Sequence, residues 1–118
     1  MEKDYRVSEH FYKSEMSCPC CGLYLPNSEL LDILEGVRKH FSVPIIVNSS
    51  TRCEEHNRRV GGAEHSQHLL GYAADIVVKG VDPLLVYEYL LERYEDGYGI
   101  GKYTSFTHID TRNYKARW

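Results

Sequence analysis

The chain has 118 residues and a mass of 13.7 kDa, which predicts one domain over residues 1–118. Its hydrophobic content of 42% is typical of a globular protein, and its apolar runs are too short to cross a membrane. With 14 basic and 17 acidic residues the net charge is −3, which argues against a nucleic-acid-binding surface.

The first 17 residues are polar, with scattered aromatic side chains and no clear hydrophobic period. We expect them to form an N-terminal arm of turns with a short extended piece. The charged start, Met1–Arg6, lacks the apolar segment of a secretory signal. We therefore expect synthesis in the cytoplasm without export by that route.

Helical and extended patterns follow the arm. A helix is predicted over 28–41, because a capping residue precedes an acidic first turn and apolar residues recur at helical spacing. The other predicted elements are a strand at 45–47, a short helix at 54–60, a strand at 73–78, a helix from Asp82–Pro83 to about residue 95, and a strand at 106–111. Glycines 97, 99 and 101 are interpreted as a turn, and the tail 113–118 is expected to pack only through Tyr114 and Trp118.

Three polar side chains stand at unexpected places in this pattern. His68 precedes the strand at 73–78, Asp75 lies inside it, and His108 lies inside the strand at 106–111. Two neutral imidazoles and one carboxylate form a ligand set that leaves the fourth zinc position open, as in catalytic sites. Core hydrogen bonds to the histidines and an arginine partner for Asp75 would explain the same residues. Spacing alone leaves both interpretations open.

The sequence motifs around these residues resemble those of a known protein family. Residues 66–75 read SQHLLGYAAD, in the form SxHxxGxAxD, which resembles the signature of the zinc D-Ala-D-Ala carboxypeptidases and related murein peptidases. The stretch 106–110, FTHID, is similar to the closing HxD element of that family. Arg52 and the EHN and VGGA stretches precede the first motif in the same order as in that family, so the resemblance covers about residues 18–111 and is strongest to small members from phages and prophages.

The resemblance implies an α+β fold of the hedgehog/DD-peptidase type, with a small antiparallel sheet flanked by helices. It implies that His68, Asp75 and His108 bind zinc. Arg52 matches the position whose guanidinium binds the substrate carboxylate, although a lone arginine is more often solvated or ion-paired. Ser66 is placed with Arg52 in the substrate-binding part of the site, where we expect it to bond the loop rather than to attack substrate.

The sequence departs from the family pattern at the general base. Family members usually carry an acid a few residues before the last histidine ligand, but residues 102–107 are KYTSFT. Asp110 is the first candidate, because it shares a strand face with His108 at roughly 6 to 7 Å along the chain. His65 is the next candidate for the general base, and Glu64 comes after it. The alternative role for Asp110 is to orient a ligand histidine, and the alternative for the two loop residues is plain solvent exposure.

These features predict a zinc metallopeptidase that hydrolyses peptidoglycan stem peptides as a monomer, with zinc-bound water as the nucleophile. A phage-encoded protein would reach the cell wall on release or on the virion. One alternative is a catalytically inactive zinc-binding module that binds cell-wall peptide or a partner protein. Another is a cytoplasmic dipeptidase, which would prefer free dipeptides to cross-linked peptidoglycan.

The four cysteines allow several states. Cys18, Cys20 and Cys21 lie close together near the start, and Cys53 directly follows Arg52. The spacings Cys18-x-x-Cys21 and Cys53-x-x-His56 suit a second, structural zinc. A disulfide from Cys20 or Cys21 to Cys53, or buried thiols, would explain the cysteines as well.

Overall fold

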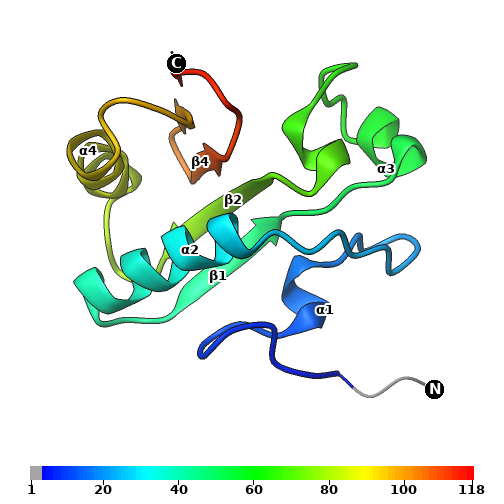
Figure 1. Ribbon diagram of the computed structural model, residues 1–118, viewed down its shortest axis with the longest axis horizontal. Coiled ribbons are helices and arrows are strands. Elements are labelled where there is room, and N and C mark those ends of the chain that lie inside the picture. The colour runs from blue at the N-terminus through cyan, green and yellow to red at the C-terminus, as the bar shows by residue number, and fades with distance from the viewer. Residues whose placement is uncertain (1–3) are drawn as a thin grey trace.

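A five-stranded sheet in the order β1-β2-β4-β3-β5 organises the structure, a computed structural model that describes residues 4–118 (Figure 1). Neighbouring strands are antiparallel except for the parallel pair β3–β5. The strands are β1 (Ile45–Ser49), β2 (Ala73–Val78), β3 (Gly99–Lys102), β4 (Thr107–Asp110) and β5 (Ala116–Arg117). The predicted α+β class with a small, mostly antiparallel sheet is confirmed.

The helices begin where the sequence supplies caps. Asn27 Oδ1 accepts the N–H of Leu30 at 3.0 Å, and Asp82 Oδ1 accepts the N–H of Leu84 at 2.9 Å. The helical elements are α1 (Lys13–Met16), α2 (Ser28–Phe41), α3 (Glu54–Arg59), the 3-10 helix η1 (Gln67–Leu70) and α4 (Pro83–Arg93). Among residues 4–118, no helix combines the length and apolar character that crossing a bilayer requires.

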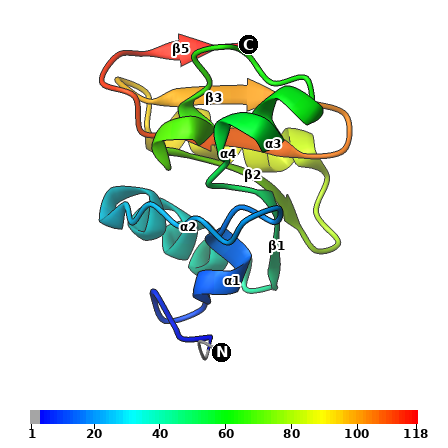
Figure 2. The same ribbon diagram turned by 90° about the vertical axis from the view of Figure 1, so that its right-hand side faces the viewer.

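The two faces of the sheet have different chemistry. Alternate strand residues, among them Ile76, Ile100 and Ile109, are buried in the apolar core with side chains of α2 and α4. Their neighbours in β2 and β4, Asp75 and His108, therefore point to the opposite face. In Figure 2, α3 lies in front of the strands and α4 behind them. The face that carries the isoleucines thus packs into the core, and the opposite face carries the polar side chains of Asp75 and His108.

Gly99 and Gly101 lie in strand β3, so the prediction of a turn was wrong for these two glycines, whereas Gly97 lies in the bend before the strand. Gly99 lies opposite Asp110, and Gly101 lies opposite His108. A Cβ at residue 99 would collide with the side chains of Asp110 and Arg112, and one at residue 101 with the indole of Trp118. Glycine stands in β3 because other side chains occupy the space above it.

The C-terminal tail also differs from its prediction, because its backbone joins the sheet. The N–H of Trp118 donates to Ile100 O at 3.2 Å, and Trp118 O accepts the N–H of Lys102 at 2.7 Å. A strand as short as β5 leaves no periodic pattern in the sequence.

The N-terminal arm packs into the core and contains a helical turn, which the prediction of turns and an extended piece missed. Phe11 and Met16 are 1% and 2% exposed. Glu15 Oε1 accepts the N–H of Tyr12 at 2.9 Å and closes the turn of α1. Residues 1–3 of the predicted arm and of the charged start lie outside the described residues.

Glu35 of α2 fixes the arm by hydrogen bonds. Its Oε2 accepts Ser8 Oγ at 2.6 Å and the N–H of His10 at 2.7 Å. Burial raises the pKa of Glu35, but the bonds from Ser8 and His10 outweigh it and hold the pKa below its usual value. The carboxylate therefore stabilises the fold above its unfolded pKa, and this contribution is lost as the pH falls through the folded pKa.

We expect Glu35→Gln to lower the free energy of unfolding by about 1–3 kcal/mol at pH 7, since it weakens hydrogen bonds to a charged acceptor. The difference from wild type should shrink in acid. Urea unfolding at neutral and acidic pH measures it, with exposed Glu92→Gln on α4 as the matched control. Equal loss at both pH values would show that charge is irrelevant to this contact.

Candidate metal centre

Two of the three predicted metal ligands are brought together by strand register. Asp75 of β2 lies directly opposite His108 of β4. Opposed residues of antiparallel strands share a face, so the two side chains meet. Asp75 Oδ1 lies 2.8 Å from His108 Nδ1. Both residues are buried, with 8% and 7% exposure.

The third predicted ligand, His68, is held by η1. Ser66 Oγ accepts the N–H of His68 at 3.2 Å and caps this short helix, and Gly71 ends it at a φ of +73°. His68 Nδ1 lies 2.7 Å from the carbonyl oxygen of Ser50. Because a carbonyl only accepts, Nδ1 carries a proton, and Nε2 lies 3.2 Å from Asp75 Oδ2.

His108 is oriented from its far side by Asp110. His108 Nε2 lies 2.7 Å from Asp110 Oδ2, which leaves Nδ1 facing Asp75. Asp110 is wholly buried, and its Oδ1 also accepts the N–H of Gly99 at 3.2 Å. Arg112 donates to both carboxylate oxygens, from Nε at 2.8 Å and from Nη2 at 2.7 Å, and its backbone N–H donates at 3.1 Å. Asp110 thus makes five hydrogen bonds.

The three side chains fit a zinc ion in chemistry and in arrangement. One nitrogen or oxygen atom of each of His68, Asp75 and His108 lies within 4.8 Å of the others. Each imidazole is also bonded on its other nitrogen, to Ser50 O or to Asp110, and such partners orient metal-binding histidines. The group can therefore hold a metal ion, and two imidazoles with one carboxylate suit zinc.

The electrostatics of the group keep the Asp75 side chain ionised, which is the form in which a carboxylate binds a metal ion. Burial raises the pKa of Asp75, but hydrogen bonds from His108 and His68 hold it well below its usual range. Burial likewise opposes ionisation of Asp110, whose pKa is held low by Arg112 and His108. Burial lowers the pKa of His108, yet the two carboxylates raise it above its ordinary value. Metal binding must displace a proton from His108 and is therefore weakened in acid.

Arg52 lies beside the metal ligands and is already bonded three times. Its Nη2 lies 3.3 Å from Asp75 Oδ2, its Nη1 donates to Asn57 Oδ1 at 3.1 Å, and its Nε donates to Ser49 Oγ at 3.0 Å. A guanidinium has five N–H groups, so two are left for a substrate. Burial lowers the pKa of Arg52, and the Asp75 carboxylate opposes that effect.

A cavity of about 510 Å³ opens in front of the ligand group. It contains Arg52, Ser66 and His65 as well as the three ligands, so the structure brings these sequence-predicted residues together. Glu64 instead lines an adjoining hollow with Arg52 and His65, and Asp110 lies behind His108. These positions do not by themselves assign a catalytic role to His65 or Asp110.

Sequence reasoning missed much of the cavity lining. The indole of Trp118 lies 5.1 Å from the His108 ring, centre to centre, and its Nε1 donates to Tyr103 Oη at 2.9 Å. Arg112 lies against the same indole and holds Asp110. Only the alternation of Asp110 and Arg112 in the sequence could have suggested their pairing. Nothing local placed Trp118 over His108.

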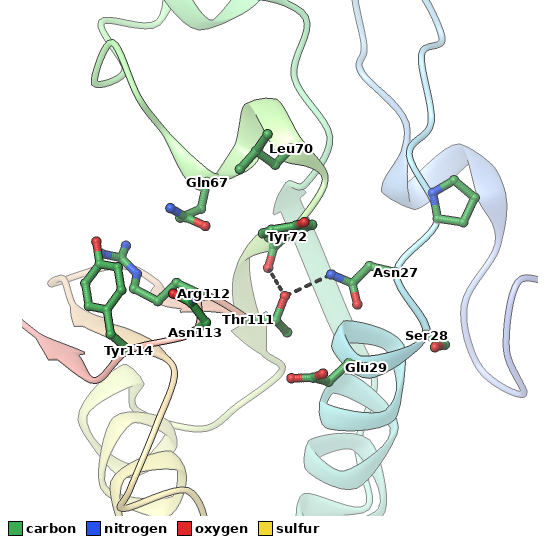
Figure 3. A pocket seen from close by; sticks show the side chains of 11 residues that line it. Asn27, Ser28, Glu29, Gln67, Leu70, Tyr72, Thr111, Arg112, Asn113 and Tyr114 are labelled. Carbon is green, nitrogen blue, oxygen red and sulfur yellow. Dashed lines mark hydrogen bonds between the residues drawn. The ribbon is translucent and has the colours of Figure 1, made fainter.

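Another hollow, of about 620 Å³, adjoins the cavity at the ligand group, because Gln67, Arg112 and Tyr114 line both. Figure 3 shows Asn27 and Thr111 pointing toward each other across it. Asn27 Nδ2 donates to Thr111 Oγ1 at 2.8 Å, and Thr111 Oγ1 donates to Tyr72 O at 3.4 Å. The cavity at the metal group therefore continues into this hollow.

The four cysteines form a second group with metal-ligand chemistry. Sulfur atoms of Cys18, Cys20, Cys21 and Cys53 lie within 4.8 Å of one another. The predicted structural zinc site had His56 in place of Cys20. The close group found among residues 4–118 includes Cys20 and leaves His56 out. Spacing could not distinguish them, because both residues stand beside the other predicted ligands in sequence.

Comparison with known proteins agrees with this geometry. The model of a family described as peptidase M15 matches residues 8–110, a segment that contains His68, Asp75 and His108. No curated protein matches the chain. Because the family match covers most of its length, the chain belongs to the peptidase M15 family.

Proposed function

We propose that the protein is a zinc-dependent peptidase that hydrolyses peptidoglycan stem peptides, as a D-Ala-D-Ala carboxypeptidase or a murein endopeptidase. The carrying observation is the buried His68, Asp75 and His108 group at the cavity, in a chain of the peptidase M15 family. Three protein ligands leave one position of a tetrahedral ion open, which is typical of catalytic zinc.

The residues around the ligands fit peptide hydrolysis. Bound zinc would supply polarisation of the scissile carbonyl and a water molecule of lowered pKa. Arg52, with its two remaining N–H groups, would hold the carboxylate of D-Ala or diaminopimelate and so place the scissile bond beside the ligands. Ser66 would act through the backbone of His68, which it caps.

Asp110 is better suited to positioning than to proton transfer. A general base must reach the attacking water, but Asp110 is wholly buried and bonded to His108, Gly99 and Arg112. We assign Asp110 the role of orienting His108. His65, exposed at the cavity, is then the candidate for the base among the residues predicted from the sequence.

One observation favours a second candidate function. Residues 102–107 contain no acid, and the carboxylate of Asp110 is fully engaged. A module that keeps the metal and binds cell-wall peptide without cleaving it would have these features. The two candidates predict the same zinc content and differ in product formation.

We expect the zinc-loaded protein to release a defined fragment from purified muropeptides, with cleavage abolished by a chelator and restored by zinc. Mass spectrometry of monomeric pentapeptide stems and of cross-linked dimers separates loss of D-Ala from cleavage of the cross-link. A parallel assay with free D-Ala-D-Ala as the substrate tests for a dipeptidase. Zinc binding and peptide binding without any product would favour the non-catalytic module.

A further inference from the structure

The four-cysteine group lies outside the cavity, where the N-terminal arm meets the loop before α3. Cys18, Cys20 and Cys21 follow α1, and Cys53 is the N-cap of α3. Cys18 Sγ lies 3.7 Å from both Cys20 Sγ and Cys53 Sγ, and the Cys20 and Cys53 sulfurs are 3.2 Å apart. Segments more than 30 residues apart thus bring their cysteine sulfur atoms together.

These separations match those of sulfur atoms around one zinc ion. Four thiolates at about 2.3 Å from a tetrahedral zinc lie about 3.8 Å from one another. The two distances from Cys18 agree with this spacing. The shorter Cys20–Cys53 separation involves an exposed side chain, which is free to turn outward. Cys21 completes the set within 4.8 Å.

The local backbone is shaped to gather the sulfurs. The N–H of Gly22 donates to Cys18 O at 2.8 Å, and Gly22 has a φ of +78°, which closes a tight turn around Cys20 and Cys21. The N–H of Cys53 donates to Cys18 Sγ at 3.5 Å, and the N–H of His56 donates to Cys53 Sγ at 3.4 Å. Hydrogen bonds to sulfur favour the thiolate, the form that binds metal.

The geometry points to a structural zinc ion bound by the thiolates of Cys18, Cys20, Cys21 and Cys53, separate from the His68, Asp75 and His108 group. Four protein ligands close the coordination sphere, which is the mark of a structural site. The ion would tie the arm to the segment that carries Arg52. That segment already meets the arm through the N–H of Thr51, which donates to Met16 O at 3.1 Å.

The test does not depend on peptidase activity. His68→Ala removes a ligand of the first group and leaves the cysteines untouched. We expect this variant, purified with zinc under reducing conditions, to retain one zinc per chain in native mass spectrometry, against two for wild type. Its four thiols should resist Ellman's reagent, and a mercurial should release the zinc. A metal-free His68→Ala protein with four reactive thiols, or with a disulfide, would overturn the proposal.

The identity of the fourth ligand is tested on the same background. X-ray absorption at the zinc edge should show four sulfur neighbours at about 2.3 Å. Three sulfurs and one nitrogen would restore His56 and overturn the four-cysteine set. Cys20→Ser should weaken zinc retention against a competing chelator at least tenfold, while His56→Ala should leave it unchanged. The spectrum of the His68→Ala protein decides the matter even where Cys20→Ser fails to fold.

Discussion

His68→Ala is expected to lose the zinc of the His–Asp–His group and, with it, all peptide hydrolysis above the level of chelator-treated wild type. His68 Nε2 faces Asp75 Oδ2 at 3.2 Å, and no other described imidazole belongs to this close ligand group besides that of His108. Two remaining ligands bind zinc far more weakly than three, so the metal needed for the reaction is lost. Zinc analysis and muropeptide mass spectrometry on one preparation measure both effects.

His40→Ala is the matched control for this variant. His40 lies on α2, where its ring stacks on Tyr89 at 4.2 Å, remote from the sulfur and imidazole groups in sequence and contacts. It should keep full zinc content and activity. If His68→Ala still cleaved muropeptides at the wild-type rate, the His–Asp–His group could not be the catalytic centre.

Asp110→Asn is expected to lower zinc affinity by about 10–100-fold, because it weakens the partner that orients His108. The unfolding free energy should fall by about 1–3 kcal/mol as well, since Arg112 loses its anionic acceptor. The telling measurement is the dependence of kcat on zinc concentration. A positioning role predicts that saturating zinc restores most of the wild-type kcat.

A general-base role for Asp110 predicts the opposite zinc dependence. A loss of kcat by about a hundredfold or more would then persist at saturating zinc. The pH profile gives a second readout, because removal of the base eliminates the acidic limb of the kcat profile. Asp96→Asn, at an exposed turn after α4, controls for the loss of one negative charge and should change neither kcat nor zinc affinity.

The sequence was most informative where local chemistry and tertiary structure agree. Asn27 and Asp82 cap α2 and α4 as their positions indicate, and Ala73–Val78 forms the predicted strand. The spacing of His68, Asp75 and His108 suggested a metal site, and the family resemblance identified zinc as the expected metal. The register between β2 and β4 then explains why residues so far apart in the chain become neighbours.

Prediction failed where an element depends on distant partners. The turn interpretation of Gly99 and Gly101 followed from glycine's ordinary preference, whereas their place in β3 depends on Asp110 and Trp118 above them. β5 exists only through its pairing with β3. The choice of Cys20 over His56 in the sulfur group depends on how the turn at Gly22 folds back.

The glycines of β3 also bear on efforts to engineer a more stable protein. Replacing glycine usually stabilises a fold by restricting the unfolded chain, wherever the native backbone and the surrounding space permit a side chain. Gly97 has open space around its missing Cβ, whereas Gly99 and Gly101 do not. In β3 the space over the glycines is already taken by Asp110, Arg112 and Trp118, so a side chain there would displace the groups that orient His108 and pack beside it, and the usual gain in stability would not follow.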